Sequence, residues 1–234
     1  MDTAVSSALL RRVSEGSFPE AVRLHRPAAM VAFGPNDRHA PGYAAAVAAA
    51  RAAGFGAVER LAGGRAAVFH EDTIAFSWIV PDPVPRLRIR QRFEWLSSLM
   101  AEAFLRLGVD ARIGAVPGEY CPGEHSVNAR GSVKLMGVGQ RLVKGAAHVG
   151  GVVVVDGAAR VREVLVPVYD ALGLAWDPVT VGALADEAPG VTWEGAIGAV
   201  QEAFARSRGL TVGAVPADVV EEASRTAMRF VPDV

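Results

Sequence analysis

The chain has little that could crosslink it or draw it to a charged surface. It contains one cysteine among 234 residues, so no intramolecular disulfide can form, and no Cys/His cluster has zinc-like spacing. We therefore predict no metal site. Lysine plus arginine number 24 and aspartate plus glutamate 25, which leaves no net basic field for nucleic acid or anionic lipid.

Long apolar runs are missing as well. No uninterrupted apolar stretch approaches the length of a membrane-spanning helix. The first residues show neither the basic region nor the apolar region of a signal peptide. We expect a cytoplasmic protein that binds neither membrane nor nucleic acid.

What is present is an alternation of strand-like and helix-like segments. No Pro/Gly/Ser-rich or charged linker divides the chain, and its length suits one large core, so we predict a single domain over residues 1–234. Short β-branched runs closed by Gly, Pro or Asp alternate with helical patterns. From about residue 161 the pattern is helical only, which predicts a helical flank on an α+β domain.

Strands are predicted at residues 28–33, 57–60, 66–70, 74–80, 109–113, 126–128, 133–136 and 150–155. Helices are predicted at residues 43–53, 86–107, 161–172, 179–185, 193–208 and 217–229. Short connectors join the second, third and fourth of these strands, which predicts that they are sequential antiparallel neighbours. We expect one mostly antiparallel or mixed sheet with flanking helices.

Three segments could carry chemistry. The first, residues 60–70, has the sequence RLAGGRAAVFH, in which paired glycines let the backbone pass close to a ligand. It resembles the arginine, paired-glycine and Val-Phe-His motif of lipoate-protein ligases and octanoyltransferases. The resemblance implies that Arg60, Gly63, Gly64, Val68 and His70 bind the substrate.

The second segment joins Cys121-Pro-Gly to the sequence VKLMGVGQR at residues 133–141, and the third is HVGGVVVV at residues 148–155. They resemble the cysteine loop, the lysine motif and the following strand of octanoyltransferases, above all the amidotransferases that take octanoate from the glycine-cleavage H protein. The resemblance implies that Cys121 forms an acyl thioester and that Lys134 contacts the acyl carbonyl. It also implies a substrate pocket that includes Gly137, Val138, His148 and Val152.

The chemistry of acyl transfer fits these residue types. Transfer to an amine needs a nucleophile, a proton shuttle and donors for the oxyanion, and a nearby lysine lowers the pKa of a thiol. A lone intracellular cysteine is more often a small buried apolar residue, and a lone lysine is more often solvated. The Pro/Gly-rich loop around Cys121 and the apolar neighbours of Lys134 favour the catalytic interpretation.

Taken together, the segments resemble the biotin/lipoate A/B protein ligase superfamily. The resemblance implies the biotinyl/lipoyl-transferase fold, which is similar to the core of class II aminoacyl-tRNA synthetases. It implies transfer of an octanoyl or lipoyl group from a carrier protein, through Cys121, to the lysine of a lipoyl domain. The expected partners are lipoyl-domain proteins and the glycine-cleavage H protein or an acyl carrier protein, and no cofactor is required.

Two alternatives stay open. An ATP-dependent lipoate-protein ligase would use ATP and Mg²⁺ and no cysteine. Such enzymes usually carry an additional small domain or a partner subunit, and we expect little room for such a domain beyond the helical flank. The other alternative is a non-catalytic relative that binds acyl groups. It stays open because Arg65 stands where the family often has a third glycine.

Overall fold

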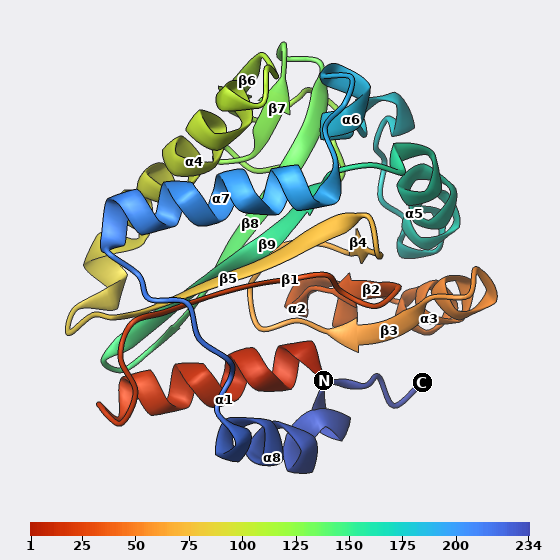
Figure 1. The fold of residues 1–234 in the computed structure, drawn as a ribbon. Helices are drawn as coiled ribbons and strands as arrows, with labels where there is room; N and C mark the ends of the chain where they lie inside the picture. Colours follow the sequence, from red (N-terminus) through yellow and green to blue (C-terminus); the bar gives the residue numbers. More distant parts are fainter.

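Nine strands form two β-sheets at the centre of the molecule (Figure 1). The strands are β1 (Ala21–His25), β2 (Met30–Phe33), β3 (Gly56–Glu59), β4 (Ala67–Phe69), β5 (Thr73–Pro81), β6 (Ala111–Ile113), β7 (Val127–Ala129), β8 (Val133–Val143) and β9 (Ala146–Val154). The larger sheet has the order β1-β5-β9-β8-β7-β6 and is antiparallel throughout. The smaller has the order β3-β2-β4, with β2 parallel to β3 and antiparallel to β4. This computed structural model describes residues 1–234.

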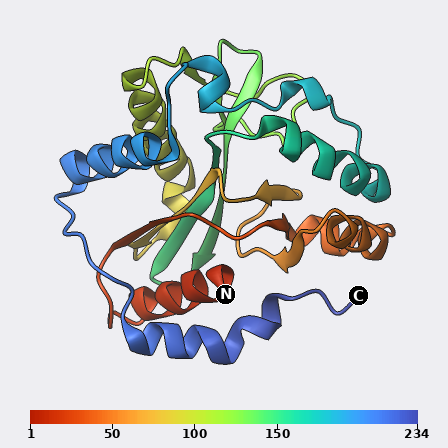
Figure 2. The same cartoon turned by 45° about the vertical axis from the view of Figure 1, so that its right-hand side comes forward.

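Helices surround both sheets. They are α1 (Asp2–Ser14), α2 (Pro35–Arg38), α3 (Tyr43–Ala52), α4 (Ile89–Arg106), α5 (Ala158–Leu172), α6 (Leu184–Glu187), α7 (Trp193–Arg208) and α8 (Ala217–Thr226), with 3₁₀ helices η1 (Pro85–Arg88), η2 (Pro178–Thr180) and η3 (Ala227–Phe230). Helices α4 and α7 pack together over the larger sheet, α3 packs on α5 beside the smaller one, and α1 lies alongside α8 (Figures 1 and 2). The predicted α+β class is confirmed.

The layer between α4 and the larger sheet follows from two sequence periods. Side chains alternate between faces along a strand, so Ile74, Phe76 and Trp78 of β5 all enter the core under α4. On α4, Leu96 and Phe104 are completely buried and lie about two helical turns apart on one face. This helix is therefore amphipathic, as its sequence predicts.

The second core lies between the smaller sheet and the helix pair α3 and α5. Ala46 and Ala50 of α3 are completely buried, because a helix rich in alanine can approach its neighbour closely. At the start of α3, an ideal Cβ on Gly42 would lie 1.7 Å from the carbonyl oxygen of Ala171. Only glycine fits at this contact between the two helices.

The predicted antiparallel pairing of residues 57–60, 66–70 and 74–80 is wrong. Strand β2 lies between β3 and β4, and β5 belongs to the other sheet. The reason is that β2, α3 and β3 form a β-α-β unit, in which the connecting helix returns the chain to a parallel neighbour. The short connector after β3 therefore crosses β2 instead of forming a hairpin.

The helix predicted at residues 179–185 is also wrong. The side chain of Asp177 accepts the N–H of Val179 at 3.1 Å and starts the short helix η2 instead. Val181 then forms an isolated parallel bridge with Lys134, and the N–H of Gly182 donates to the carbonyl of Lys134 at 3.0 Å. These residues are extended because they hold the beginning of β8.

The remaining predicted elements are present with shifted ends. Strand β8 continues to residue 143, beyond its predicted end at 136, and the helix predicted at 217–229 is divided into α8 and η3. The sequence patterns predict neither α1 nor β1. The interpretation of residues 1–234 as one domain stays a prediction. None of the helices combines the length and apolar character needed to cross a membrane.

A methyl group at Gly34 tests the contact between the end of β2 and the glycine turn at Gly63 and Gly64. An ideal Cβ on Gly34 would lie 1.8 Å from the carbonyl oxygen of Gly64, whereas a Cβ on Gly63 would meet nothing within 4 Å. We expect Gly34→Ala to lower the free energy of unfolding by about 1–3 kcal/mol, the usual cost of overpacking. Gly63→Ala is the matched control in urea unfolding, and equal stability of the two variants would contradict the contact.

Candidate active site

Cys121 lies in the loop at residues 114–126, between β6 and β7. Two prolines and several glycines keep this loop out of regular structure. Cys121 itself has a φ of 42°, in the left-handed region that residues with a side chain seldom adopt. Such backbone strain persists only where the surroundings fix it, and it is concentrated at functional sites.

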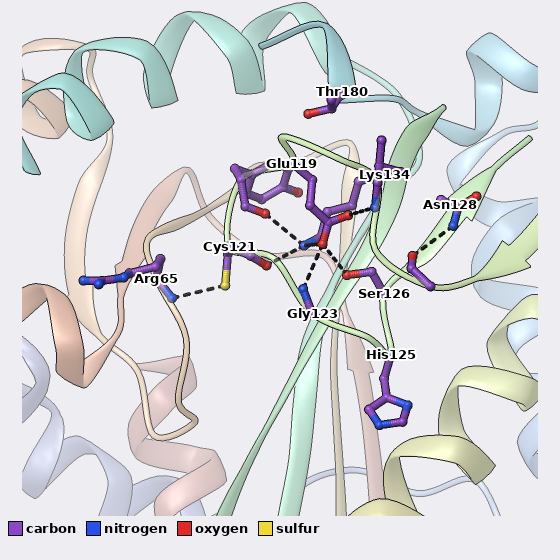
Figure 3. A network of polar contacts seen from close by, with 12 residues as sticks. Arg65, Glu119, Cys121, Gly123, His125, Ser126, Asn128, Lys134 and Thr180 are labelled. Atoms are coloured by element: carbon purple, nitrogen blue, oxygen red, sulfur yellow. Dashed lines mark hydrogen bonds and ion pairs between the residues drawn. The ribbon is translucent and has the colours of Figure 1, made fainter. Parts of the chain in front are cut away.

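Two side chains from distant elements fix the backbone of Cys121. Its N–H donates to the hydroxyl of Tyr169 at 3.0 Å, and that hydroxyl donates to the carbonyl of Ala66 at 3.0 Å. Its carbonyl accepts a hydrogen bond from Nζ of Lys134 at 2.7 Å (Figure 3). Helix α5 and strand β8 thus hold the residue from two sides, which leaves its sulfur facing the glycine turn.

Glu119 is the centre of the polar network behind the cysteine (Figure 3). Its carboxylate accepts hydrogen bonds from the N–H of Val116 at 2.9 Å, the N–H of Gly123 at 3.0 Å, the hydroxyl of Ser126 at 2.8 Å and Nζ of Lys134 at 3.0 Å. The side chain is completely buried, and a buried carboxylate is tolerated only with this degree of pairing. Glu119 therefore connects both ends of the cysteine loop to β8.

Lys134 is only 1% exposed, and its amine is fully used within the protein. Nζ donates to Glu119 and to the carbonyls of Tyr120 and Cys121, at 3.0, 3.0 and 2.7 Å. An ammonium has three protons, so each of them has an acceptor. No hydrogen bond joins this amine to the sulfur of Cys121, because the amine faces the backbone of the loop.

The sulfur of Cys121 lies against the glycine turn. It accepts hydrogen bonds from the N–H of Arg65 at 3.1 Å and from Nη2 of Arg60 at 3.4 Å. Nη2 of Arg60 also donates to the carbonyl of Arg65 at 2.6 Å, which fixes the guanidinium beside the sulfur. Gly64 has a φ of +105°, and an ideal Cβ there would lie 2.8 Å from the sulfur, so this position requires glycine.

Arg65, where the glycine turn departs from the motif it resembles, directs its side chain away from the cysteine (Figure 3). Its guanidinium lies 3.3 Å from the carbonyl of Asn36 and 3.3 Å from the carboxylate of Asp37. Its φ is not positive, so the position does not need glycine. The substitution therefore leaves the backbone N–H available to the sulfur.

The surrounding charges favour a thiolate at Cys121. Burial by itself raises the pKa of the thiol, but the positive charges of Arg60 and Lys134 and the N–H of Arg65 lower it, and the resulting pKa lies below the ordinary value. Burial also lowers the pKa of Lys134, against the opposing effect of the Glu119 carboxylate. The three acceptors around Nζ favour the charged amine.

Two cavities are lined by neighbouring residues of the segment 60–64. The first, here called the sulfur groove, is lined by Cys121, Gly63, Gly64, Val138, Ile89, Arg90 and Leu142 among others. The second, called the inner cavity, is lined by residues of both sheets and of α1, including Met30, Ala32, Arg60, Phe69, Ala75 and His148. Arg60 belongs to the inner cavity and contacts the sulfur, so it connects the two spaces. No group of three or more His, Cys, Asp or Glu side chains is placed to hold a metal ion.

Not every predicted binding residue lies at these cavities. Val68, His70, Gly137 and Val152 line neither of them. Val68 and Val152 belong to the core under α3 and α5. An ideal Cβ on Gly137 would lie 3.3 Å from Cε of Lys134, so this glycine makes room for the lysine side chain. The binding roles of these residues stay predictions.

The two predicted histidines differ in their surroundings. His70 is completely buried, its Nδ1 accepts the N–H of Asp72 at 3.2 Å, and its ring fills the space beside Gly157. His148 lines the inner cavity, and its Nδ1 has no hydrogen-bond partner. Burial lowers the pKa of His148 to about 4, so the ring is neutral at neutral pH.

Three residues of the network are not among the predicted site residues: Glu119, Ser126 and Tyr169. Glu119 is not predicted because a glutamate in a Pro/Gly-rich loop has the sequence pattern of a solvated side chain. Tyr169 is not predicted because it lies on a helix, 48 residues beyond the cysteine. The available signal is the position of Glu119, two residues before the single cysteine. Tyr169 leaves no signal in the sequence because its contact depends on how α5 packs.

The fold is that of lipoate-protein ligases. A crystal structure of lipoate-protein ligase A bound with ATP has a TM-score of 0.74 at 16% identity, covering 96% of this chain and 87% of that chain. A bi-partite lipoate protein ligase from Thermoplasma acidophilum has a TM-score of 0.71 at 18% identity, covering 96% of this chain and 86% of that chain. The lipoyl-transferase fold implied by the motifs is confirmed.

The chain belongs to the lipoyl protein ligase A/B catalytic domain family, whose profile matches residues 1–205. It is 29% identical over 170 residues to the octanoyl-GcvH:protein N-octanoyltransferase of Geobacillus kaustophilus, covering 73% of this chain and 60% of that protein. It is 26% identical over 145 residues to the lipoyl-GcvH:protein N-lipoyltransferase of Listeria monocytogenes, covering 62% of this chain and 52% of that protein. The chain thus spans less than two thirds of the length of these relatives, and the resemblance to octanoyltransferases is confirmed.

The thiol of Cys121 should be alkylated by iodoacetamide at lower pH than an ordinary cysteine, because the thiolate is the reacting form. Arg60→Gln removes a positive charge beside the sulfur and should raise the midpoint pH of alkylation by about 1. Arg65→Ala keeps the backbone N–H that contacts the sulfur, so its midpoint should match that of the wild type. The rate is followed by intact mass across pH, and an unchanged midpoint in Arg60→Gln would contradict this electrostatic account.

Glu119→Gln leaves the buried charge of Lys134 without its anion. Breaking a buried ion pair costs about 3–5 kcal/mol, so we expect a loss of that size in the free energy of unfolding in urea. Adding Lys134→Met removes the unpaired charge, and the double variant should regain part of the loss. If Glu119→Gln alone were as stable as the wild type, the carboxylate would not hold the network together.

Proposed function

We propose that the protein is an acyltransferase that moves an octanoyl or lipoyl group from a carrier protein to the lysine of a lipoyl domain, through a thioester on Cys121. One observation carries the proposal: a strained thiol lines the sulfur groove and contacts Arg60, a cation that lines the inner cavity. The two relatives described above are named for transfer of octanoyl and lipoyl groups.

The reaction then has two steps. In the first, the Cys121 thiolate attacks the acyl carbonyl, the S–C bond forms, the C–N bond to the carrier lysine breaks, and the leaving amine takes a proton. In the second, the acceptor lysine attacks the thioester, the C–S bond breaks, and the attacking amine loses a proton as the thiolate is regenerated. One lysine amide replaces another, so the exchange consumes no ATP and requires no cofactor.

Within this mechanism, different residues activate the Cys121 thiol and hold the loop that carries it. Arg60 and the N–H of Arg65 stabilise the thiolate, since both contact the sulfur. Lys134 holds the loop through three hydrogen bonds and contributes positive charge near the thiol. We therefore propose that Lys134 positions Cys121 by binding its backbone carbonyl and that its positive charge lowers the pKa of the thiol.

The inner cavity suits the acyl chain. Ala32, Phe69 and Ala75 contribute apolar walls, and each methylene that leaves water gains about 0.8 kcal/mol. The proposed partners are lipoyl-domain proteins together with the glycine-cleavage H protein or an acyl carrier protein. A cytoplasmic location stays the prediction made from the sequence.

The test uses a thioester donor, because acylation from an amide is uphill and leaves little adduct. We expect octanoyl carrier protein to add one octanoyl group to the purified protein, seen by intact mass, and Cys121→Ala to abolish the adduct. Arg206→Ala on the exposed face of α7 is the control variant. Octanoylated H protein and an unmodified lipoyl domain should then exchange the octanoyl group in the presence of the wild type.

The alternatives give different results in the same samples. Pyrophosphate release that depends on ATP and lipoate, without an adduct, would assign the protein as a lipoate-protein ligase. Acyl binding without either activity would assign it as a non-catalytic relative. Both outcomes would remove Cys121 from the proposed mechanism.

A further inference from the structure

Positive charge is concentrated on one face of the molecule, beside η1 and the turn between β8 and β9. This basic face carries four exposed side chains: Arg86, Arg88, Arg90 and Lys144. The two segments contact each other, and the N–H of Asp82 donates to the carbonyl of Gly145 at 2.8 Å. Figure 1 shows at the left the turn where β5 ends and the chain enters α4.

Few carboxylates offset this charge. Arg86 and Lys144 form no ion pair, Arg88 lies 3.7 Å from Asp82, whose carboxylate is buried, and Arg90 pairs with Glu94 at 2.6 Å. The whole chain has a formal net charge of −1. The unpaired Arg86 and Lys144 therefore leave a local positive field on this face, which a negatively charged partner would follow.

Apolar side chains lie among these charges. Leu87 is 83% exposed, and Val84 and Ile89 are also exposed. A protein interface typically combines an apolar centre with a charged rim. The face therefore has the composition of a protein-binding surface.

The basic face is continuous with the sulfur groove. A second groove on this face is lined by Leu87 and Lys144 and shares Ile89 and Leu142 with the sulfur groove. The sulfur groove in turn is lined by Cys121. The two grooves are therefore adjacent, and a molecule seated on the basic face can extend a side chain toward the sulfur past Ile89 and Leu142.

We propose that the basic face docks the body of an acidic acyl-carrying protein, whose acylated lysine side chain extends along the sulfur groove to Cys121. This inference rests on the proposed function and adds the docking surface and the charge of the partner. A second copy of this chain fits the face poorly, because a twofold contact would set positive side chains against positive side chains.

The test reverses two charges that lie outside the catalytic network, in the variant Arg86→Glu with Lys144→Glu. We expect its KM for octanoylated H protein to rise at least about tenfold with kcat nearly unchanged, because charges at the rim of an interface act mainly on association. Acylation of Cys121 by the uncharged donor octanoyl-N-acetylcysteamine should stay unchanged. The KM of the wild type should rise with ionic strength, and that of the variant should respond less.

A matched control carries the same change of charge elsewhere, at Arg225→Glu with Arg229→Glu on α8 and η3, where both arginines are exposed. Its KM should stay at the wild-type value at equal ionic strength. A readout independent of turnover is the affinity of Cys121→Ala for octanoylated H protein, which the two reversals at Arg86 and Lys144 should weaken by a similar factor.

Three outcomes would overturn the inference. An unchanged KM and affinity in the reversed variant, with normal transfer by the wild type, would reject the docking surface and leave the proposed function intact. A change in oligomeric state by light scattering, with KM unchanged, would assign the face to a second copy of the chain. If octanoyl-N-acetylcysteamine failed to acylate Cys121 in the wild type and octanoylated H protein failed to transfer its octanoyl group, the proposed function would be rejected, and the docking inference with it.

Discussion

The arrangement of the site depends on a buried ion pair between Glu119 and Lys134. Moving two charges out of water is expensive, and attraction between them offsets the cost only when further hydrogen bonds satisfy the remaining donors and acceptors. Here the carboxylate has three additional donors and the amine has two carbonyl acceptors, so the pair is saturated. It joins a loop without regular structure to the middle of a sheet, and the position of Cys121 follows from that connection.

The pair explains how a cysteine can keep an unfavourable backbone conformation. A left-handed φ at a residue with a Cβ costs of order 1–3 kcal/mol, which the surrounding contacts must supply. The carbonyl of Cys121 is held by Lys134 and its N–H by Tyr169, so relaxing the backbone would break two buried hydrogen bonds. Lys134 is held in turn by Gly182, whose N–H binds its carbonyl. The strained residue is thus supported by α5, β8 and the segment before α6.

The sequence predicts the local features of this protein better than the contacts between distant segments. The helices at residues 43–53 and 193–208 follow from propensity and period, which act within a few residues. The position of β2 between β3 and β4 depends on a crossover through α3, which the short connector after β3 conceals. Cys121 and Lys134 are identified because a motif marks them, whereas Glu119 and Tyr169 act only through contacts that appear once the chain has folded. Val68 is likewise marked by a motif, but the structure places it in the core under α3 and α5, so its predicted binding role rests on the motif alone.

The different positions of Lys134 and Arg60 around Cys121 also indicate different roles for the two cations. A lysine whose three protons are all bound to the loop cannot donate to a substrate without leaving those acceptors, and each buried acceptor left unpaired would cost about 1–3 kcal/mol. Contact between Lys134 and an acyl carbonyl would therefore require the cysteine loop to rearrange when substrate binds. Arg60 faces no such obstacle, because its guanidinium already contacts the sulfur and lines the inner cavity. The proposed mechanism therefore assigns contact with the acyl group to Arg60, which contacts the sulfur and lines the inner cavity, and assigns to Lys134 the support of the cysteine loop.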